Sequence, residues 1–148
     1  MINNLIIRQY QNSDFSLWNS FIEESKNATF LFHRDFMEYH AERFADFSLL
    51  IFEKQRLLAV LPANRVGATL FSHQGLTYGG LVLKDKTHLA DVIIIMQQVL
   101  IFLNQNQIQI LQLKIIPSIY ATIPSDEMDY ISFLVHANLI RKDSLAVI

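Results

Sequence analysis

The chain has 148 residues, no cysteine, a formal net charge of −2 and a hydrophobic content of 51%. One domain, residues 1–148, accounts for this length, and such a composition can bury a core without disulfides or metals. The 11 phenylalanines and the low charge exclude a disordered protein, and the lack of a basic excess argues against sequence-specific nucleic-acid binding. The lack of cysteine excludes disulfide scaffolds and thiolate catalysis.

The chain carries no recognisable export signal or membrane segment. Its first four residues hold no positive charge and do not open a long apolar run. Residues 92–113 are uncharged, but glutamines and asparagines interrupt them, whereas a spanning helix needs about 20 mostly apolar residues. We therefore expect no transmembrane segment and a cytoplasmic location, with which a chain without cysteine agrees.

The first third of the sequence predicts one strand and two helices. Residues 5–10 are typical of a strand, and residues 12–14 offer N-cap side chains before a helix. One face of that helix collects Phe15, Trp18, Phe21 and Ile22. A second helix is expected over residues 33–43, with a stripe of Phe32, Phe36, Tyr39 and Arg43.

The middle of the chain predicts antiparallel strands. Residues 47–52 and 57–64 flank a polar turn and indicate a hairpin. A turn at residues 66–68 leads to a strand over residues 69–72, and residues 81–83 form another strand.

The last third alternates helices and strands. A helix capped by Thr87 runs to Leu103, with a core stripe of Val92, Met96, Val99 and Leu103. Residues 108–116 predict a parallel or central strand, and residues 124–136 a helix followed by a left-handed cap at Asn138. Residues 139–148 predict a final strand.

This order of elements predicts an α/β or α+β fold in which helices flank one mixed, largely antiparallel central sheet.

Two strings of residues are distinctive. They are residues 27–40, Asn-Ala-Thr-Phe-Leu-Phe-His-Arg-Asp-Phe-Met-Glu-Tyr-His, and residues 72–80, Ser-His-Gln-Gly-Leu-Thr-Tyr-Gly-Gly. Together with residues 61–64 and 116–120, they resemble a bacterial subgroup of the GNAT acyltransferases that is similar to the Fem-type aminoacyl transferases of cell-wall synthesis. The resemblance spans nearly the whole chain but only the first half of such proteins, which have two GNAT-like halves.

The resemblance implies a GNAT-like fold and a reaction in which an amine attacks an activated acyl group. The donor would be acetyl-CoA, another acyl-CoA, or an aminoacyl-tRNA. The acceptor would be a small molecule or a cell-envelope precursor. The remaining partner would be a second GNAT-like domain or a second copy of the chain, as in a homodimer.

The chain departs from the GNAT pattern in two places. GNAT enzymes cradle the coenzyme A pyrophosphate on a glycine-rich loop at a helix N-terminus. Here residues 84–88 before the equivalent helix hold no glycine, and Leu134 stands where many GNAT enzymes place a tyrosine that protonates the leaving thiolate. A first half that contributes acceptor binding and scaffold, with no tightly bound cofactor, fits these departures. Two alternatives stay open: a free-standing acetyltransferase with an atypical acetyl-CoA site, and a non-catalytic association domain.

The candidate acceptor site lies between the predicted helix at residues 33–43 and the strip at residues 72–80. Three of the chain's 4 glycines fall in the strip, which indicates close approach of a ligand or of a neighbouring helix. The resemblance places His40 at about the position where Fem-type enzymes have a basic residue that binds phosphate. Arg43, one turn later, could bind phosphate in a bidentate manner. The alternative is a bulged strand whose polar groups satisfy one another. The candidate residues are His40, Arg43, His73, Gln74, Thr77, Tyr78, Gly79 and Gly80.

Other reactive patterns are weak. His33 and His40 share a helical face near Glu38 and Glu42, but no H-E-x-x-H spacing is present, so we expect no metal site. Ser72 and His73 are adjacent on a strand and point to opposite faces, which argues against a catalytic triad. The acidic residues at positions 126, 127 and 129 suit the positive end of a helix. No catalytic residue is assigned.

Overall fold

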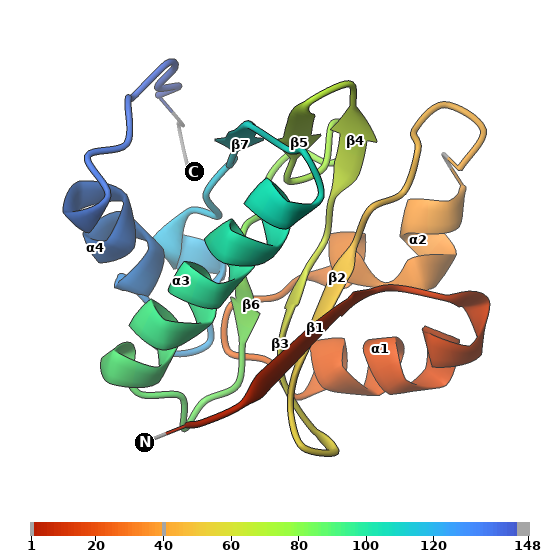
Figure 1. Cartoon of the computed structure of the whole chain (residues 1–148), viewed down its shortest axis with the longest axis horizontal. Coiled ribbons are helices and arrows are strands. Elements are labelled where there is room, and N and C mark those ends of the chain that lie inside the picture. The colour runs from red at the N-terminus through yellow and green to blue at the C-terminus, as the bar shows by residue number, and fades with distance from the viewer. Residues whose placement is uncertain (1, 40, 145–148) are drawn as a thin grey trace.

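Helices and strands alternate along the part of the chain that the computed structural model describes, residues 2–39 and 41–144 (Figure 1). In chain order they are β1 (Leu5–Gln9), α1 (Phe15–Glu23), α2 (Arg34–Glu38), β2 (Leu49–Glu53), β3 (Arg56–Leu61), β4 (Asn64–Val66), β5 (Thr69–Phe71), β6 (Val82–Leu83), α3 (Leu89–Gln105), β7 (Ile110–Gln112) and α4 (Glu127–Leu134). Short 3-10 turns cover Asn12–Asp14, Phe30–Phe32 and Ser118–Tyr120. The predicted α+β class is confirmed.

The strands form two sheets where the sequence predicted one. An antiparallel sheet has the order β1-β2-β3-β6, and a second sheet has the order β4-β5-β7. The division falls at Pro62, between β3 and β4, because proline has no N–H to donate to a ladder. Strand β7 runs parallel to β5, as predicted, but lies at the edge of its sheet.

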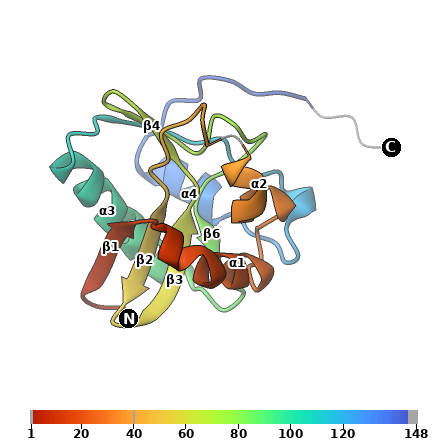
Figure 2. The same ribbon diagram turned by 90° about the vertical axis from the view of Figure 1, so that its right-hand side faces the viewer.

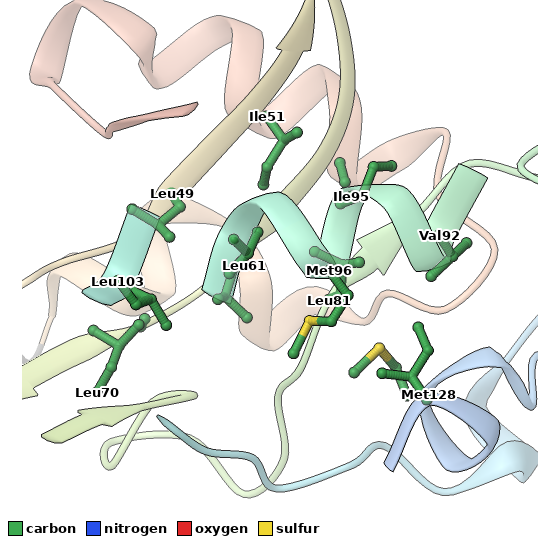
Figure 3. Close-up of a cluster of buried hydrophobic side chains, with 14 of the residues drawn as sticks. Leu49, Ile51, Leu61, Leu70, Leu81, Val92, Ile95, Met96, Leu103 and Met128 are labelled. Atoms are coloured by element: carbon green, nitrogen blue, oxygen red, sulfur yellow. The ribbon is translucent and has the colours of Figure 1, made fainter. Parts of the chain in front are cut away.

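Helices cover both faces of the four-stranded sheet. Alternate residues of β2 explain how: Leu49 and Ile51 face one core with α3 and α4, while Leu50 and Phe52 face the other with α1 and α2. Figures 1 and 2 show α1 and α3 on opposite sides of β1–β3. Figure 3 shows side chains of α3 and of Met128 in α4 gathered over strands of the sheet.

The predicted stripes of α1 and α3 are buried. Trp18 is fully buried and its indole Nε1 donates to the Phe32 carbonyl at 2.7 Å, which fixes α1 against the segment before α2. In α3 the stripe Val92, Met96, Val99 and Leu103 is buried together with Ile95. Helix α3 begins at Leu89, with His88 rather than Thr87 at the N-cap position.

The second helix is shorter than predicted. It ends at Glu38 instead of Arg43, and the Ala41 amide closes a turn on the Glu38 carbonyl at 3.0 Å. The residues that predicted a longer helix do not share one buried helical face. Tyr39 is 83% exposed, and Phe32 lies in the preceding 3-10 turn. The chain turns here.

The C-terminal region also differs from the prediction. The left-handed residue after α4 is His136, with φ of 51°, instead of Asn138. Residues 139–144 form no strand and are exposed, since no strand in the described part of the chain lies beside them. Residues 145–148 of the predicted strand lie outside the described residues.

Candidate functional site

Residues 72–80, called here the glycine loop, follow β5. The loop begins beside β7 and ends beside the residues that follow β7. The parallel pairing of β5 with β7 ends at Phe71 and Gln112 and resumes at an isolated bridge between Gly79 and Ile115. Residues 72–78 therefore bulge out opposite residues 113 and 114. Two hydrogen bonds hold the start of the loop against the neighbouring strand. The Ser72 amide donates to the Gln112 carbonyl at 3.0 Å, and Ser72 Oγ accepts from the Lys114 amide at 2.9 Å.

Close packing within the chain explains two of the loop glycines. A Cβ on Gly79 would lie 1.9 Å from the Ser72 carbonyl oxygen, and a Cβ on Gly75 would lie 2.7 Å from the ring of Phe44. Gly80 has φ of 100°, which other residues rarely adopt. The sequence left open whether a ligand or the neighbouring helix approaches these glycines. Instead, Gly79 is approached by Ser72 of the same loop and Gly75 by Phe44 in the turn after α2.

The polar residues of the loop point inward more than predicted. His73 is 3% exposed, its ring lies edge-on to Phe44 at 5.4 Å, and its Nδ1 accepts from the Gly75 amide at 3.2 Å. The Gln74 Oε1 accepts from Asn64 Nδ2 at 2.8 Å, and the Gln74 amide donates to Asn64 Oδ1 at 2.7 Å. The polar groups of His73 and Gln74 are therefore hydrogen-bonded to groups of the same chain, as the bulged-strand alternative predicted.

The other loop residues are divided between surface and interior. Thr77 is exposed, whereas Gly79 and Gly80 are buried. Tyr78 is half-buried and stacks on Tyr120 with ring centres 5.2 Å apart. Of the predicted loop residues, only Gln74 and Thr77 are exposed, so the strip is not the open polar surface that the sequence suggested.

The glycine loop and the segment around α2 lie side by side, as predicted. Tyr78 meets Phe32 edge-on at 6.2 Å, and His73 meets Phe44. Aromatic rings fill this contact, however, and Arg43 lies exposed in the turn after α2. His40 lies outside the described residues. The remaining predicted residues do not line either of the two depressions described below.

The larger depression lies on the surface formed by the Phe30–Phe32 turn and α2. It is open, has a volume of about 560 Å³, and is lined by Phe30, His33, Asp35, Phe36 and Tyr39. Phe30 is 67% exposed and meets Phe36 at a right angle with ring centres 5.5 Å apart. Aromatic faces attract organic cations, and Asp35 is the acidic residue of this lining. We call this surface the aromatic depression.

The sequence did not predict this depression, because Phe36 and Tyr39 were placed on one face of a longer helix and packing was favoured for Tyr39 over a place in an acceptor pocket. A signal was present: the aromatics of residues 30–39 exceed what one helical face can bury, and an aspartate lies among them. The Asp35 carboxylate accepts from Asn19 Nδ2 of α1 at 3.1 Å, which orients it.

A buried arginine fixes α2 beneath the depression. Arg34 is 3% exposed and donates to Asp46 Oδ2 at 2.9 Å and to Ser48 Oγ at 3.2 Å. Its guanidinium lies 3.5 Å from the ring centre of Tyr10. These contacts tie α2 to the residue after β1 and to the segment before β2, which indicates a structural role for Arg34. The sequence analysis did not single it out.

Two lysines are also held by the fold. Lys26 is 4% exposed and forms an ion pair with Glu127 at the start of α4. Burial raises the pKa of Glu127, but hydrogen bonds from Lys26 and Ser125 outweigh burial, so the pKa lies below its usual value. The Lys114 amine donates to the Leu76 carbonyl of the glycine loop, and burial lowers its pKa. Glu127 thus has an ion-pair partner as well as the helix-terminal role predicted for it.

The start of α3 does not offer an anion site. A second depression, of about 180 Å³, lies there and includes Arg56, Lys84, Lys86 and Asp91 in its lining. Lys84 pairs with Glu24 and Arg56 with Glu53, both at 2.6 Å, and Asp91 occupies the first turn of the helix. Two of the three cations are therefore paired, whereas Lys86 has no ion pair among the described residues. The segment also lacks the glycines that would let backbone amides approach phosphate.

The described residues offer neither a metal site nor a membrane-spanning helix. No group of three or more histidine, aspartate or glutamate side chains in residues 2–39 and 41–144 is placed to hold a metal ion. None of the helices there combines the length and apolar character needed to cross a bilayer.

Comparison with models of known protein families gives no match, and comparison with curated proteins also gives none.

Proposed function

We propose that this chain is the acceptor-binding domain of a GNAT-like N-acyltransferase of the FemAB type. Its sequence strings at residues 27–40 and 72–80 support this proposal, and these two segments meet through the rings of Phe32 and Tyr78. The acyl donor, a coenzyme A thioester or an aminoacyl-tRNA, binds outside this domain. The start of α3 lacks the glycines of a pyrophosphate loop, and two of the three cations around it, Lys84 and Arg56, are already paired with carboxylates.

The observation that carries the proposal is the aromatic depression. An amine acceptor is a cation before it loses its proton, and cations bind to aromatic faces and carboxylates. Phe30 and Tyr39 present exposed rings, and Asp35 supplies the charge. Acyl transfer of this kind depends mainly on holding the amine in position for attack. The domain supplies that position, and Arg34 holds the helix that forms it.

An NMR titration tests acceptor binding. The probe is Nα-acetyl-lysine methylamide, a small primary amine, and its control is the same compound acetylated on the ε-nitrogen, which has no charge. We expect a dissociation constant of about 1 mM, worth about −4 kcal/mol, for the amine alone. The shifted resonances should be those of Phe30, Asp35 and Tyr39.

Variants separate the site from general surface binding. Asp35→Asn and Tyr39→Ala should each weaken binding at least threefold, whereas Tyr130→Ala, which removes an exposed aromatic on α4, should not. Equal shifts with the charged and acetylated probes, or shifts scattered over the surface, would exclude an amine site in the depression.

The association-domain alternative also has a specific observation in its favour. Phe133 in α4 is 71% exposed, and Leu139 and Ile140 after it are 78% and 69% exposed. Clustered exposed apolar side chains mark interaction surfaces. Acceptor binding by the depression would be absent from a domain that serves association alone, so the same titration distinguishes the two functions.

A further inference from the structure

One side of β7 and of the residues after it has no partner strand. Toward β5, the Ile110 amide donates to the Ala68 carbonyl at 3.2 Å, and the carbonyls of Gln112 and Lys114 accept from Ser72 and Gly79. Alternate residues of a strand direct their N–H and C=O groups to opposite sides. Those of Leu111, Leu113 and Ile115 therefore face outward, and in the described part of the chain none of them has a hydrogen-bond partner.

This open edge is apolar. Leu111, Leu113 and Ile115 are half-buried and pack against the core formed with α3, and Ile110 at the start of the strand is 57% exposed. Unpaired amides and carbonyls along such an edge are a template for another strand. The outward groups from residue 111 to residue 115 extend over roughly 15 Å at about 3.3 Å per residue, which is the length of an ordinary strand.

The residues after α4 have the complementary feature. Residues 139–144 are exposed and have no secondary structure, although their sequence with residues 145–148 predicts a strand. Leu139 and Ile140 expose most of their apolar surface. Figure 2 shows the described part of this segment as an extended trace along the margin of the domain. The chain therefore has an unpaired sheet edge at residues 111–115 and, after α4, a segment with a strand-like sequence that pairs with no strand in the described residues.

We propose that two copies of the chain associate by exchanging these segments. Residues 139–144 of each copy pair with the edge formed by residues 111–115 of the other. The occupant is a second copy because residues 139–144 make no backbone hydrogen bond to the edge of their own copy, and because a twofold arrangement satisfies both edges at once. Leu139 and Ile140 then pack beside the half-buried side chains of the edge. This surface is separate from the aromatic depression.

Oligomeric state and amide exchange test the proposal on the full chain. Light scattering should show a dimer, and the amides of Leu111, Leu113 and Ile115 should be protected from hydrogen exchange. Replacing both Leu139 and Ile140 with lysine should raise the dimer dissociation constant at least tenfold and remove that protection. These two side chains are exposed, so the monomer should still fold. Val66→Lys is the matched control, because Val66 is exposed on β4, the opposite edge of the same sheet.

Engineered cysteines identify the pairing, since the natural chain has none. Leu113→Cys in one population and Ile140→Cys in another should form a disulfide between chains after mixing and oxidation. A dimer that survives the double lysine substitution would overturn the proposal. So would a monomer at all concentrations, or a double-cysteine chain that forms its disulfide only within itself, which would assign the edge to the chain's own segment. None of these outcomes alters binding at the aromatic depression, so the proposed function is tested independently.

Discussion

Gly79 lies against the carbonyl of Ser72, so close that a Cβ at position 79 would be 1.9 Å from that oxygen. Each of the two residues also contacts the strand beside them: the Ser72 amide bonds to Gln112, and the Gly79 amide bonds to Lys114. The glycine loop is thus closed at its base by backbone contacts, and its shape depends on a residue without a side chain at position 79.

Gly79→Ala should destabilise the domain by more than about 2 kcal/mol, because backbone atoms must move to admit the methyl group. Urea unfolding would measure this loss. Gly67→Ala is the control: Gly67 has a positive φ, of 58°, but nothing lies within 4 Å of its Cβ position. That control should lose only about 1 kcal/mol. Equal losses for the two variants would show that the contact with Ser72 does not limit position 79.

Arg34→Met should cost about 2–4 kcal/mol in unfolding free energy, because the Asp46 carboxylate loses its ion-pair partner and the Ser48 hydroxyl loses one of its hydrogen-bond donors. Asp46 is partly exposed, which keeps the expected loss below that of a fully buried pair. The control is Arg43→Ala, which removes an exposed arginine of the following turn and should change stability by less than about 0.5 kcal/mol. A loss for Arg34→Met as small as that of the control would contradict a structural role for the network.

The elements that could be predicted from sequence are those with a long local pattern. The stripe of α3 repeats over several turns, so its buried face was visible in the order of residues alone. Arg34 carried no such signal, because burial of an arginine depends on partners that are distant in sequence, such as Asp46. The packing of Gly75 against Phe44 is another long-range contact, so the sequence showed that the glycine was special but not what approached it.

The pair between Arg8 and Asp14 makes stability depend on pH. Arg8 donates to both carboxylate oxygens of Asp14, at 2.6 and 2.7 Å, and the Gln11 amide donates to one of them at 2.9 Å. The hydrogen bonds from Arg8 lower the pKa of Asp14 against the opposing effect of burial. A carboxyl with a lowered pKa stabilises the fold fully above its unfolded pKa of about 3.9, and this contribution is lost as pH falls through the folded pKa.

Asp14→Asn should therefore reduce stability at pH 7 by about 1 kcal/mol, since Arg8 is partly exposed, and should flatten the loss of stability below about pH 4. Denaturant titrations between pH 2 and pH 7 would measure both effects. Arg8→Gln and the double variant complete a cycle that isolates the pair. If the wild-type chain and Asp14→Asn lose stability in parallel below pH 4, Asp14 is not the group that titrates.

Acetyl-CoA should not bind tightly to this chain. At the start of α3, Lys84 and Arg56 are paired with Glu24 and Glu53, and the carboxylate of Asp91 lies in the first turn, where a phosphate would have to sit. Calorimetry with the full chain should show no saturable binding up to about 100 μM acetyl-CoA, which corresponds to a binding free energy weaker than about −5.5 kcal/mol.

Two controls make the coenzyme A experiment specific. Asp91→Asn removes the competing carboxylate, and because the glycines are still missing it should not create tight binding either. Weak attraction of the phosphates to surface lysines should disappear in about 0.5 M salt, since exposed charges are screened at that ionic strength. Salt-resistant binding with a dissociation constant near 1 μM, worth about −8 kcal/mol, would instead favour a free-standing acetyltransferase with an atypical donor site.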